Sequence, residues 1–178
     1  MEDNADRDPG TVVKRGKKPT KVREFQIRLR SELDNVVYKS SDESTGNPCA
    51  VRENTCDEQD FTPVFLGHAD LYVFADKWGV TDLKMLTLTK IRSTLNTFTL
   101  YEARRRDVVE LLRFAYDNEN TRDRGDEDDG GDELRALVIL YTGCEYENLM
   151  KCSEFMDLVV EGGEFVQDLL KTLLKRLG

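Results

Sequence analysis

The sequence predicts a mainly α-helical fold that follows a charged N-terminal tail, and three observations support this. From Phe61 onward, apolar residues recur at gaps of three and four, which is the period of a helix with one buried face. Residues 1–60 hold few large apolar side chains, so they cannot bury enough surface to offset the ordering of the chain. No convincing strand pattern separates the helical segments. We therefore expect a disordered tail and linker over 1–60 and a helical region over 61–178.

The tail contains a block of basic residues without intervening acids: Lys14, Arg15, Lys17, Lys18, Lys21 and Arg23. Such a block is typical of a nuclear-import signal or a polyanion contact. A solubilising charged segment is the alternative interpretation, and the sequence does not decide between them. If the block binds nucleic acid, we expect weak binding without sequence preference, because a flexible cationic segment has no groove-fitting element.

One apolar segment interrupts the tail at residues 25–37. Phe25, Ile27 and Leu29 alternate with polar residues, a period of two that predicts a short strand. Residues 38–60 return to Ser, Asp, Glu, Asn and Gly, a composition typical of a linker.

The first helix of the body is predicted over residues 64–78, where the chain's only histidine and only tryptophan occur. We expect one side of this helix to form a structural or interaction wall, with Gly79 as a left-handed cap behind it. A histidine on an apolar helix face is more often a packed core residue than a general base. The predicted wall consists of Val64, Phe65, His68, Leu71, Tyr72, Ala75 and Trp78.

Further helices follow at regular intervals. A second begins at Thr81–Asp82 and carries Leu83, Leu86 and Ile91, and a third covers 106–118. After the charged, glycine-rich stretch 119–133, three more apolar-periodic segments are predicted over 133–150, 153–163 and 164–177.

The sequence predicts no enzyme, cofactor site or metal site. It has no glycine-rich phosphate loop, and the one histidine lacks a nucleophile at a suitable spacing. Cys49, Cys56, Cys144 and Cys152 are spaced too widely for a zinc knuckle and are expected to be free thiols. No apolar run approaches the roughly 20 residues of a membrane span, and no secretory signal is present. We therefore expect an intracellular protein, in the nucleus or cytoplasm, without a membrane partner.

The order of four segments resembles the second half of fungal BTB/POZ-domain proteins. In that family a helix of the type H-a-x-x-Y-x-x-A-[DE]-K-[WY]-x-[IV]-x-x-L is followed by a helix ending near [AV]-Y, an L-R-x-L-V segment and closing helices with E-F-x-x-L and G-x-F-x-x-D-[FL]. The matching residues are His68, Tyr72, Ala75, Asp76, Lys77, Trp78, Val80 and Leu83; 114–118; Leu134, Arg135, Leu137 and Val138; Glu154, Phe155 and Leu158; and Gly163, Phe165, Asp168 and Leu169.

The resemblance implies that the first helix packs as a structural wall against other helices and against the sheet of a BTB first half. The pattern of that first half, which supplies the dimer surface and most of the cullin-facing surface in the family, does not precede Phe61. The chain is therefore expected to be a truncated BTB protein, and association with a cullin-type ubiquitin ligase is doubtful.

Three functional hypotheses follow. The first is a non-enzymatic protein-interaction module, an incomplete BTB/POZ domain whose protein partners include BTB-containing chains. The second is a nuclear or nucleic-acid-associated protein that acts through its basic tail. The third is a remnant without a present function.

Overall fold

The computed structural model describes residues 21–35, 51–117, 121 and 131–175 of the chain, and all its regular elements are helical. They are α1 (Lys21–Asn35), α2 (Thr62–Lys77), α3 (Thr81–Thr97), a 3-10 turn (Glu102–Arg104), α4 (Arg105–Asp117), α5 (Glu133–Leu149), α6 (Ser153–Glu161) and α7 (Gly163–Leu174). No strand occurs within these residues, so the predicted mainly α-helical fold class is confirmed.

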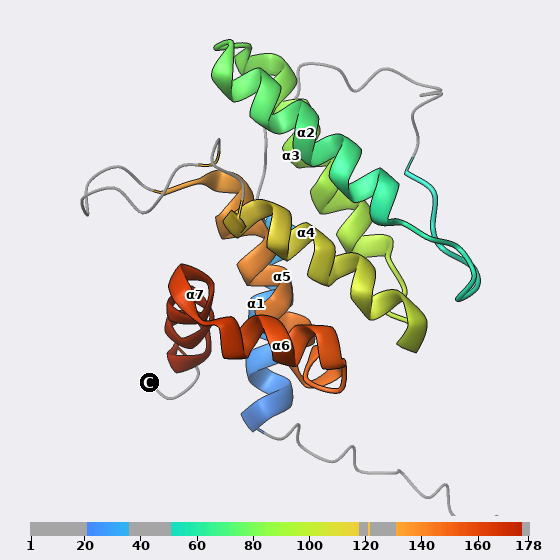
Figure 1. Ribbon diagram of the computed structural model, residues 1–178. Helices are drawn as coiled ribbons and strands as arrows, with labels where there is room; N and C mark the ends of the chain where they lie inside the picture. The colour runs from blue at the N-terminus through green and yellow to red at the C-terminus, as the bar shows by residue number, and fades with distance from the viewer. Residues whose placement is uncertain (1–20, 36–50, 118–120, 122–130, 176–178) are drawn as a thin grey trace, which may run out of the picture.

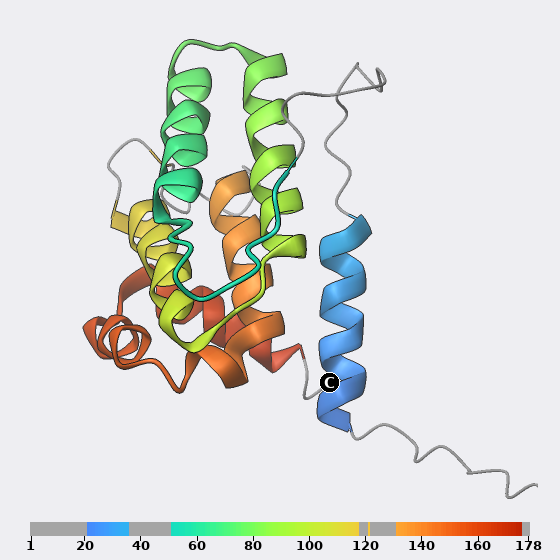
Figure 2. The same ribbon diagram turned by 90° about the vertical axis from the view of Figure 1, so that its right-hand side faces the viewer.

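The helices α2 and α3 form a hairpin that stands out from the rest of the molecule (Figure 1). Its base packs against α4 and α5, while α6 and α7 lie at the opposite end of the molecule. Turned by 90°, the structure presents one broad side of the hairpin, which none of the other described helices covers (Figure 2). The hairpin therefore has one face on the core and one face toward solvent.

The turn between α2 and α3 follows from a single glycine. Gly79 has a φ of 65°, a backbone conformation that residues with a side chain rarely adopt. This lets the amide of Val80 donate to the carbonyl of Ala75 at 2.8 Å, closing the last turn of α2 before the chain reverses. The predicted left-handed cap is confirmed.

The core lies where α2, α3, α4 and α5 meet, and α6 and α7 close its lower end. The helix α4 contributes the apolar stripe expected from its sequence, and Phe155 and Phe165 pack edge to face with ring centroids 5.9 Å apart. Fully buried members include Phe65, Leu88, Ile91, Leu95, Leu111, Leu112, Leu134, Phe155 and Phe165.

The predicted strand at Phe25–Leu29 is wrong, because residues 21–35 form the helix α1. Leu29 and Leu33, four residues apart, lie on one face and are buried against the body, whereas Ile27 is 56% exposed. The helix packs along α5, where Arg30 lies over the ring of Tyr141 at 6.0 Å. This part of the expected tail therefore belongs to the folded body, and Figure 2 shows it beside the other helices.

The expected linker also has an ordered end. Asn54 is buried, and its side chain exchanges two hydrogen bonds with the backbone of Thr99, at 2.7 and 2.6 Å. The amide of Phe61 donates to Asp107 at 2.9 Å. Residues 51–60 are thus tied to the base of the α2–α3 hairpin, and the boundary of the folded part does not lie at Phe61.

A buried arginine ties α5 to the neighbouring segments. Arg135 donates to the carbonyl of Ala115 at 3.0 Å and forms an ion pair with Glu164 of α7. Its guanidinium also lies 5.1 Å from the ring centroid of Tyr116. Because a buried charge is costly unless it is paired and hydrogen-bonded, this set of contacts fixes how α4, α5 and α7 meet.

Candidate functional site

The predicted wall on α2 is divided between two faces of the helix. Phe65, Tyr72 and Ala75 are buried, together with Ala69 and Val73. Three other predicted wall residues point to solvent: Val64 is 39%, Leu71 46% and Trp78 67% exposed, and His68 is half-buried. Of the expected stripe Val64, His68, Leu71, Ala75 and Trp78, only Ala75 is buried; the others lie on the outer edge of the hairpin, and the core-facing side is rotated toward Phe65 and Tyr72.

A polar cluster fixes this rotation of α2. The hydroxyl of Tyr72 lies 3.0 Å from a carboxylate oxygen of Asp132 and 3.0 Å from one of Glu133, at the start of α5. Lys84 of α3 completes the cluster with ion pairs to Asp76 at 2.6 Å and Glu133 at 2.7 Å. The cluster joins α2, α3 and α5 on the inner side of the hairpin.

The protonation of Glu133 follows from these partners. Burial alone would raise the pKa of this carboxyl group, but the hydrogen bonds from Lys84 and Tyr72 outweigh it, and the pKa is lowered. The pKa of Lys84 is raised, since its two carboxylate partners outweigh its own burial. Both groups are therefore charged at neutral pH.

The outer side of the hairpin contains a groove of about 670 Å³ between α2 and α3. Residues of segment 51–61 contribute to its lining together with α2 and α3. Its apolar lining comes from Val51, Phe61, Val64, Leu71, Leu83 and Leu86, and its polar lining from Arg52, Glu53, Gln59, Asp60, His68, Thr87, Lys90 and Thr94. We call this set the α2–α3 groove.

Several polar residues line the α2–α3 groove beside its apolar side chains. The hydroxyls of Thr87 and Thr94 donate to the carbonyls of Lys84 and Lys90 in their own helix, at 2.7 and 2.8 Å. Burial lowers the pKa of His68, and the charge of Lys90 lowers it further, so the imidazole is neutral at pH 7. The groove lining has no serine or cysteine beside this histidine.

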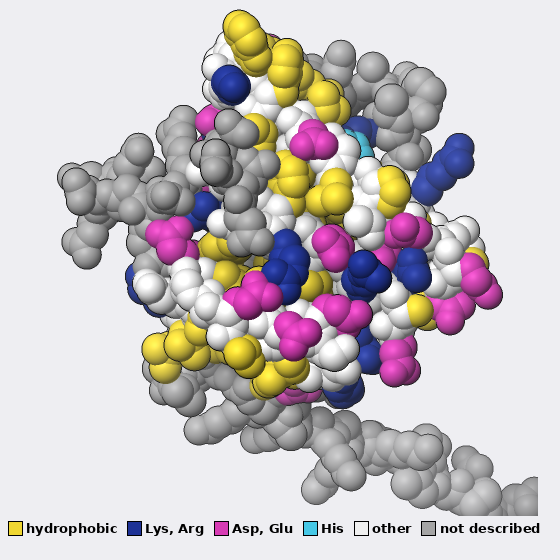
Figure 3. Space-filling model, viewed as in Figure 1, with side chains coloured by type: hydrophobic (Ala, Val, Ile, Leu, Met, Phe, Trp, Pro, Cys, Tyr) yellow, Lys and Arg dark blue, Asp and Glu magenta, His cyan; other side chains and the backbone are white. Residues whose placement is uncertain are grey.

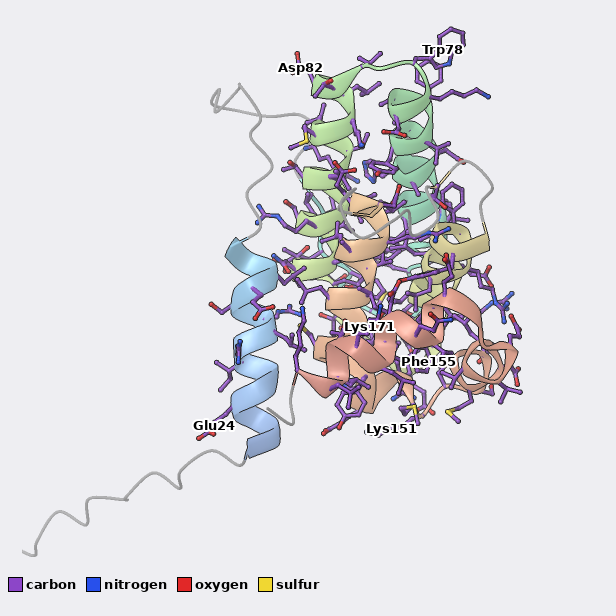
Figure 4. The ribbon with its side chains drawn as sticks, turned by 90° about the vertical axis from the view of Figure 1, so that its left-hand side faces the viewer. Glu24, Trp78, Asp82, Lys151, Phe155 and Lys171 are labelled. Carbon is purple, nitrogen blue, oxygen red and sulfur yellow. The ribbon has the colours of Figure 1, made fainter. Side chains whose placement is uncertain are left out.

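The outer end of the hairpin carries further exposed apolar residues, which do not line the groove. Phe74 and Val80 are 51% and 42% exposed, and the rings of Phe74 and Trp78 lie 6.2 Å apart. Figure 3 shows hydrophobic side chains gathered over this end, and Figure 4 shows Trp78 there, far from Lys151 and Lys171. Exposed apolar patches of this kind mark interaction surfaces in soluble proteins.

A second group of exposed apolar residues lies on the opposite end of the molecule. Met150, Met156, Val160, Leu170 and Leu174 belong to α6, α7 and the turn before them, where Figure 3 shows hydrophobic side chains along the lower edge. None of these five residues lines the α2–α3 groove. The group therefore provides a comparison for variants of the α2–α3 groove.

The predicted basic block lies mostly outside the described residues. Lys14, Arg15, Lys17 and Lys18 fall there, whereas Lys21 and Arg23 occupy the first turn of α1. Nucleic-acid binding by this block stays a prediction. Of the cysteines within the described ranges, Cys56, Cys144 and Cys152 are free thiols.

The described ranges show neither a metal cluster nor a membrane-spanning helix. No group of three or more His, Cys, Asp or Glu side chains there converges on a possible metal position. None of the helices in those ranges combines the length and the apolar character that crossing a membrane requires.

Comparison with known proteins gives no family assignment: no family model, curated protein or solved structure matches this chain. The resemblance to BTB/POZ proteins thus stays a prediction, and the function is argued from the site itself.

Sequence reasoning missed the α3 side of the groove. Leu83 and Leu86 were expected only as apolar residues of the second helix, whereas in the structure Leu86 is 41% exposed and both line the groove. The spacing Leu83–Thr87–Lys90–Thr94 was an available signal, since it places two polar and one charged residue on the same stripe as a leucine. A stripe of that composition is typical of a partly solvated face.

Proposed function

We propose that this chain is a non-enzymatic protein-interaction module and that the α2–α3 groove binds an amphipathic α-helix of a partner protein. The observation that carries the proposal is the arrangement of exposed apolar side chains along two neighbouring helices. Val64 and Leu71 on α2 and Leu83 and Leu86 on α3 line the two walls of one groove, together with His68 and Lys90.

The geometry favours a helix as the ligand. On both walls the lining residues recur at gaps of three and four. Side chains on one face of a partner helix have the same spacing, so they can pack between those of the walls. The partner helix would place apolar residues at i, i+3 or i+4, and i+7 in the upper groove. At the lower end, an acidic residue would suit Lys90 and Arg52, and a basic one would suit Glu53 and Asp60.

The surroundings of Asp60 support this charge pattern. The backbone amide of Thr62 donates to the Asp60 carboxylate at 2.9 Å, and this bond lowers its pKa, with Arg104 contributing. The carboxylate therefore stays ionised at the rim of the groove at neutral pH.

The resemblance described above suggests one class of partner. We extend the proposal to chains that carry a BTB first half, because in that family the matching helix packs against this part of the domain. Co-purification of the full chain with a separately expressed BTB first half tests this extension. Binding that Leu86→Asp abolishes supports it, and an absence of binding contradicts it without affecting the helix proposal.

Selection from a displayed library of single helices tests the proposed function. The baits are the full chain, its Leu86→Asp variant and a matched Leu170→Asp variant on α7, where Leu170 is 54% exposed. We expect enriched helices with apolar residues at helical spacing that bind the full chain and Leu170→Asp but not Leu86→Asp. Helices that bind all three baits equally, or no enrichment at all, would contradict the proposal.

A further inference from the structure

We infer that the α2–α3 groove also accepts a second copy of this chain, so that two α2–α3 hairpins pack face to face as a four-helix arrangement. This inference rests on the proposed function, since it names an occupant for the same groove. It would make the chain a reversible homodimer whose partner-binding surface is regulated by its own concentration.

The first argument is the size of the apolar surface. Among the apolar residues of the groove lining, Val64 is 39%, Leu71 46% and Leu86 41% exposed. Outside the lining, Phe74, Trp78 and Val80 add exposed apolar side chains at the outer end of the same hairpin. A standard interface takes about 800 Å² from each partner, with its most apolar part in the centre. The exposed hairpin face supplies such a centre.

The second argument is the shape of the two stripes. The walls of the groove are two helices joined by a tight turn, each with contact residues three or four positions apart. Two such hairpins, related by a two-fold axis, bring four stripes together around one shared core. The same spacing that fits one helix from another protein thus fits a second hairpin.

The third argument is charge. The chain as a whole has a net charge of −9, which opposes contact between arbitrary faces of two copies. The groove lining instead has two cations, Arg52 and Lys90, and two anions, Glu53 and Asp60. In a two-fold contact each patch meets itself, so a patch with both signs can pair with its copy, whereas a patch of one sign repels it. The groove meets this requirement.

Sedimentation equilibrium of the full chain over a range of concentrations tests the inference. We expect a reversible dimer for the wild type and for Leu170→Asp. In Leu86→Asp the dissociation constant should rise on the order of a hundredfold, because the dimer buries the introduced charge twice. Leu71→Asp provides a second groove variant, and circular dichroism confirms that each variant is folded. Both leucines are partly exposed, so the substitutions leave the core intact.

The outcomes separate the inference from the function on which it rests. A wild type that stays monomeric but binds selected helices would overturn the dimer and leave the interaction module standing. A monomer that binds no helix would overturn both. A dimer that Leu170→Asp disrupts and Leu86→Asp does not would place the contact on α7 and overturn the inference.

Discussion

The hydroxyl group of Tyr72 lies 3.0 Å from a carboxylate oxygen of Asp132, and it shares its one hydrogen between this oxygen and an equally distant oxygen of Glu133. Tyr72 is in the middle of α2 and Asp132 is the N-cap of α5, where its other oxygen accepts from the amide of Arg135 at 3.0 Å. One buried carboxylate therefore starts α5 and orients α2. Because it holds Tyr72 inward, it leaves Val64, Leu71 and Trp78 on the solvent side.

Replacing Tyr72 with Phe should destabilise the fold by about 1–3 kcal/mol, because a buried acceptor loses its partner while the ring still fills its place. Chemical denaturation with urea measures this difference. Tyr146→Phe is the control, since its hydroxyl bonds to Glu147 at the surface and its loss should change stability by less than about 0.5 kcal/mol. Equal effects of the two variants would show that the Asp132 contact does not hold α2.

The Glu133 carboxylate predicts a pH dependence of stability. Its pKa in the folded protein is lowered from the ordinary value of 4.5, so it binds protons less readily when folded than when unfolded. The contribution of Glu133 to the free energy of unfolding is present above about pH 4.5 and is lost as the pH falls through the pKa of this group in the folded protein. We expect Glu133→Gln to be less stable than the wild type at pH 7 and the difference to shrink below pH 4.5.

Urea titrations at pH 3, 5 and 7 measure the difference in unfolding free energy between Glu133→Gln and the wild type. Asp157→Asn, at an exposed position, is the matched control and should change stability by less than about 0.5 kcal/mol at pH 7. A Glu133→Gln difference that is constant with pH would contradict the role of the Lys84–Glu133 pair.

Two glycine substitutions should have effects of opposite sign. A Cβ on Gly143 of α5 would lie 2.9 Å from Cγ2 of Thr172 and 3.1 Å from Cδ1 of Leu29, so α7 and α1 both crowd this position. We expect Gly143→Ala to destabilise by roughly 1–3 kcal/mol through overpacking, despite its better helix propensity. Gly67→Ala in α2 meets nothing within 4 Å and should stabilise by about 0.5–1 kcal/mol. Thermal unfolding compares them, and a stabilising Gly143→Ala would show that α1 and α7 do not pack there.

The packing of α1 is tested by two substitutions in the same helix. Leu33 is fully buried, so Leu33→Ala should cost about 2–5 kcal/mol. Ile27 is 56% exposed, so Ile27→Ala should change stability by less than about 0.5 kcal/mol. Denaturant unfolding of both variants distinguishes a docked helix from a detached tail, in which both changes would be neutral.

The sequence was sufficient to predict the helical body because the spacing of its apolar residues and the positions of its helix-ending residues agree. Gly79 is a clear stop between two periodic segments, and α4 has a single apolar stripe. Phe25, Ile27 and Leu29 misled the prediction for residues 21–35, since three alternating apolar residues fit a strand as well as a helix. The four-residue spacing of Leu29 and Leu33 was the signal that the structure follows.

The local sequence pattern could not predict which face of α2 is buried. This helix has large apolar residues on most of its circumference, so no single stripe identifies the buried face. Its partner Asp132 lies sixty residues further along the chain. The groove depends on that long-range contact and on segment 51–60, whose attachment through Asn54 has no helical or strand signature in the sequence.

The most direct test of the open apolar groove is a fluorescence titration with 8-anilinonaphthalene-1-sulfonate, performed on the folded chain at a dilution where sedimentation shows monomers. We expect the wild type and Leu170→Asp to bind the dye with the same affinity. Leu86→Asp should lose this binding, because the charge removes the apolar wall of α3 without disturbing the core. A folded wild type that binds no dye, or binding that Leu86→Asp leaves unchanged, would contradict the claim that the α2–α3 groove is the interaction surface of this protein.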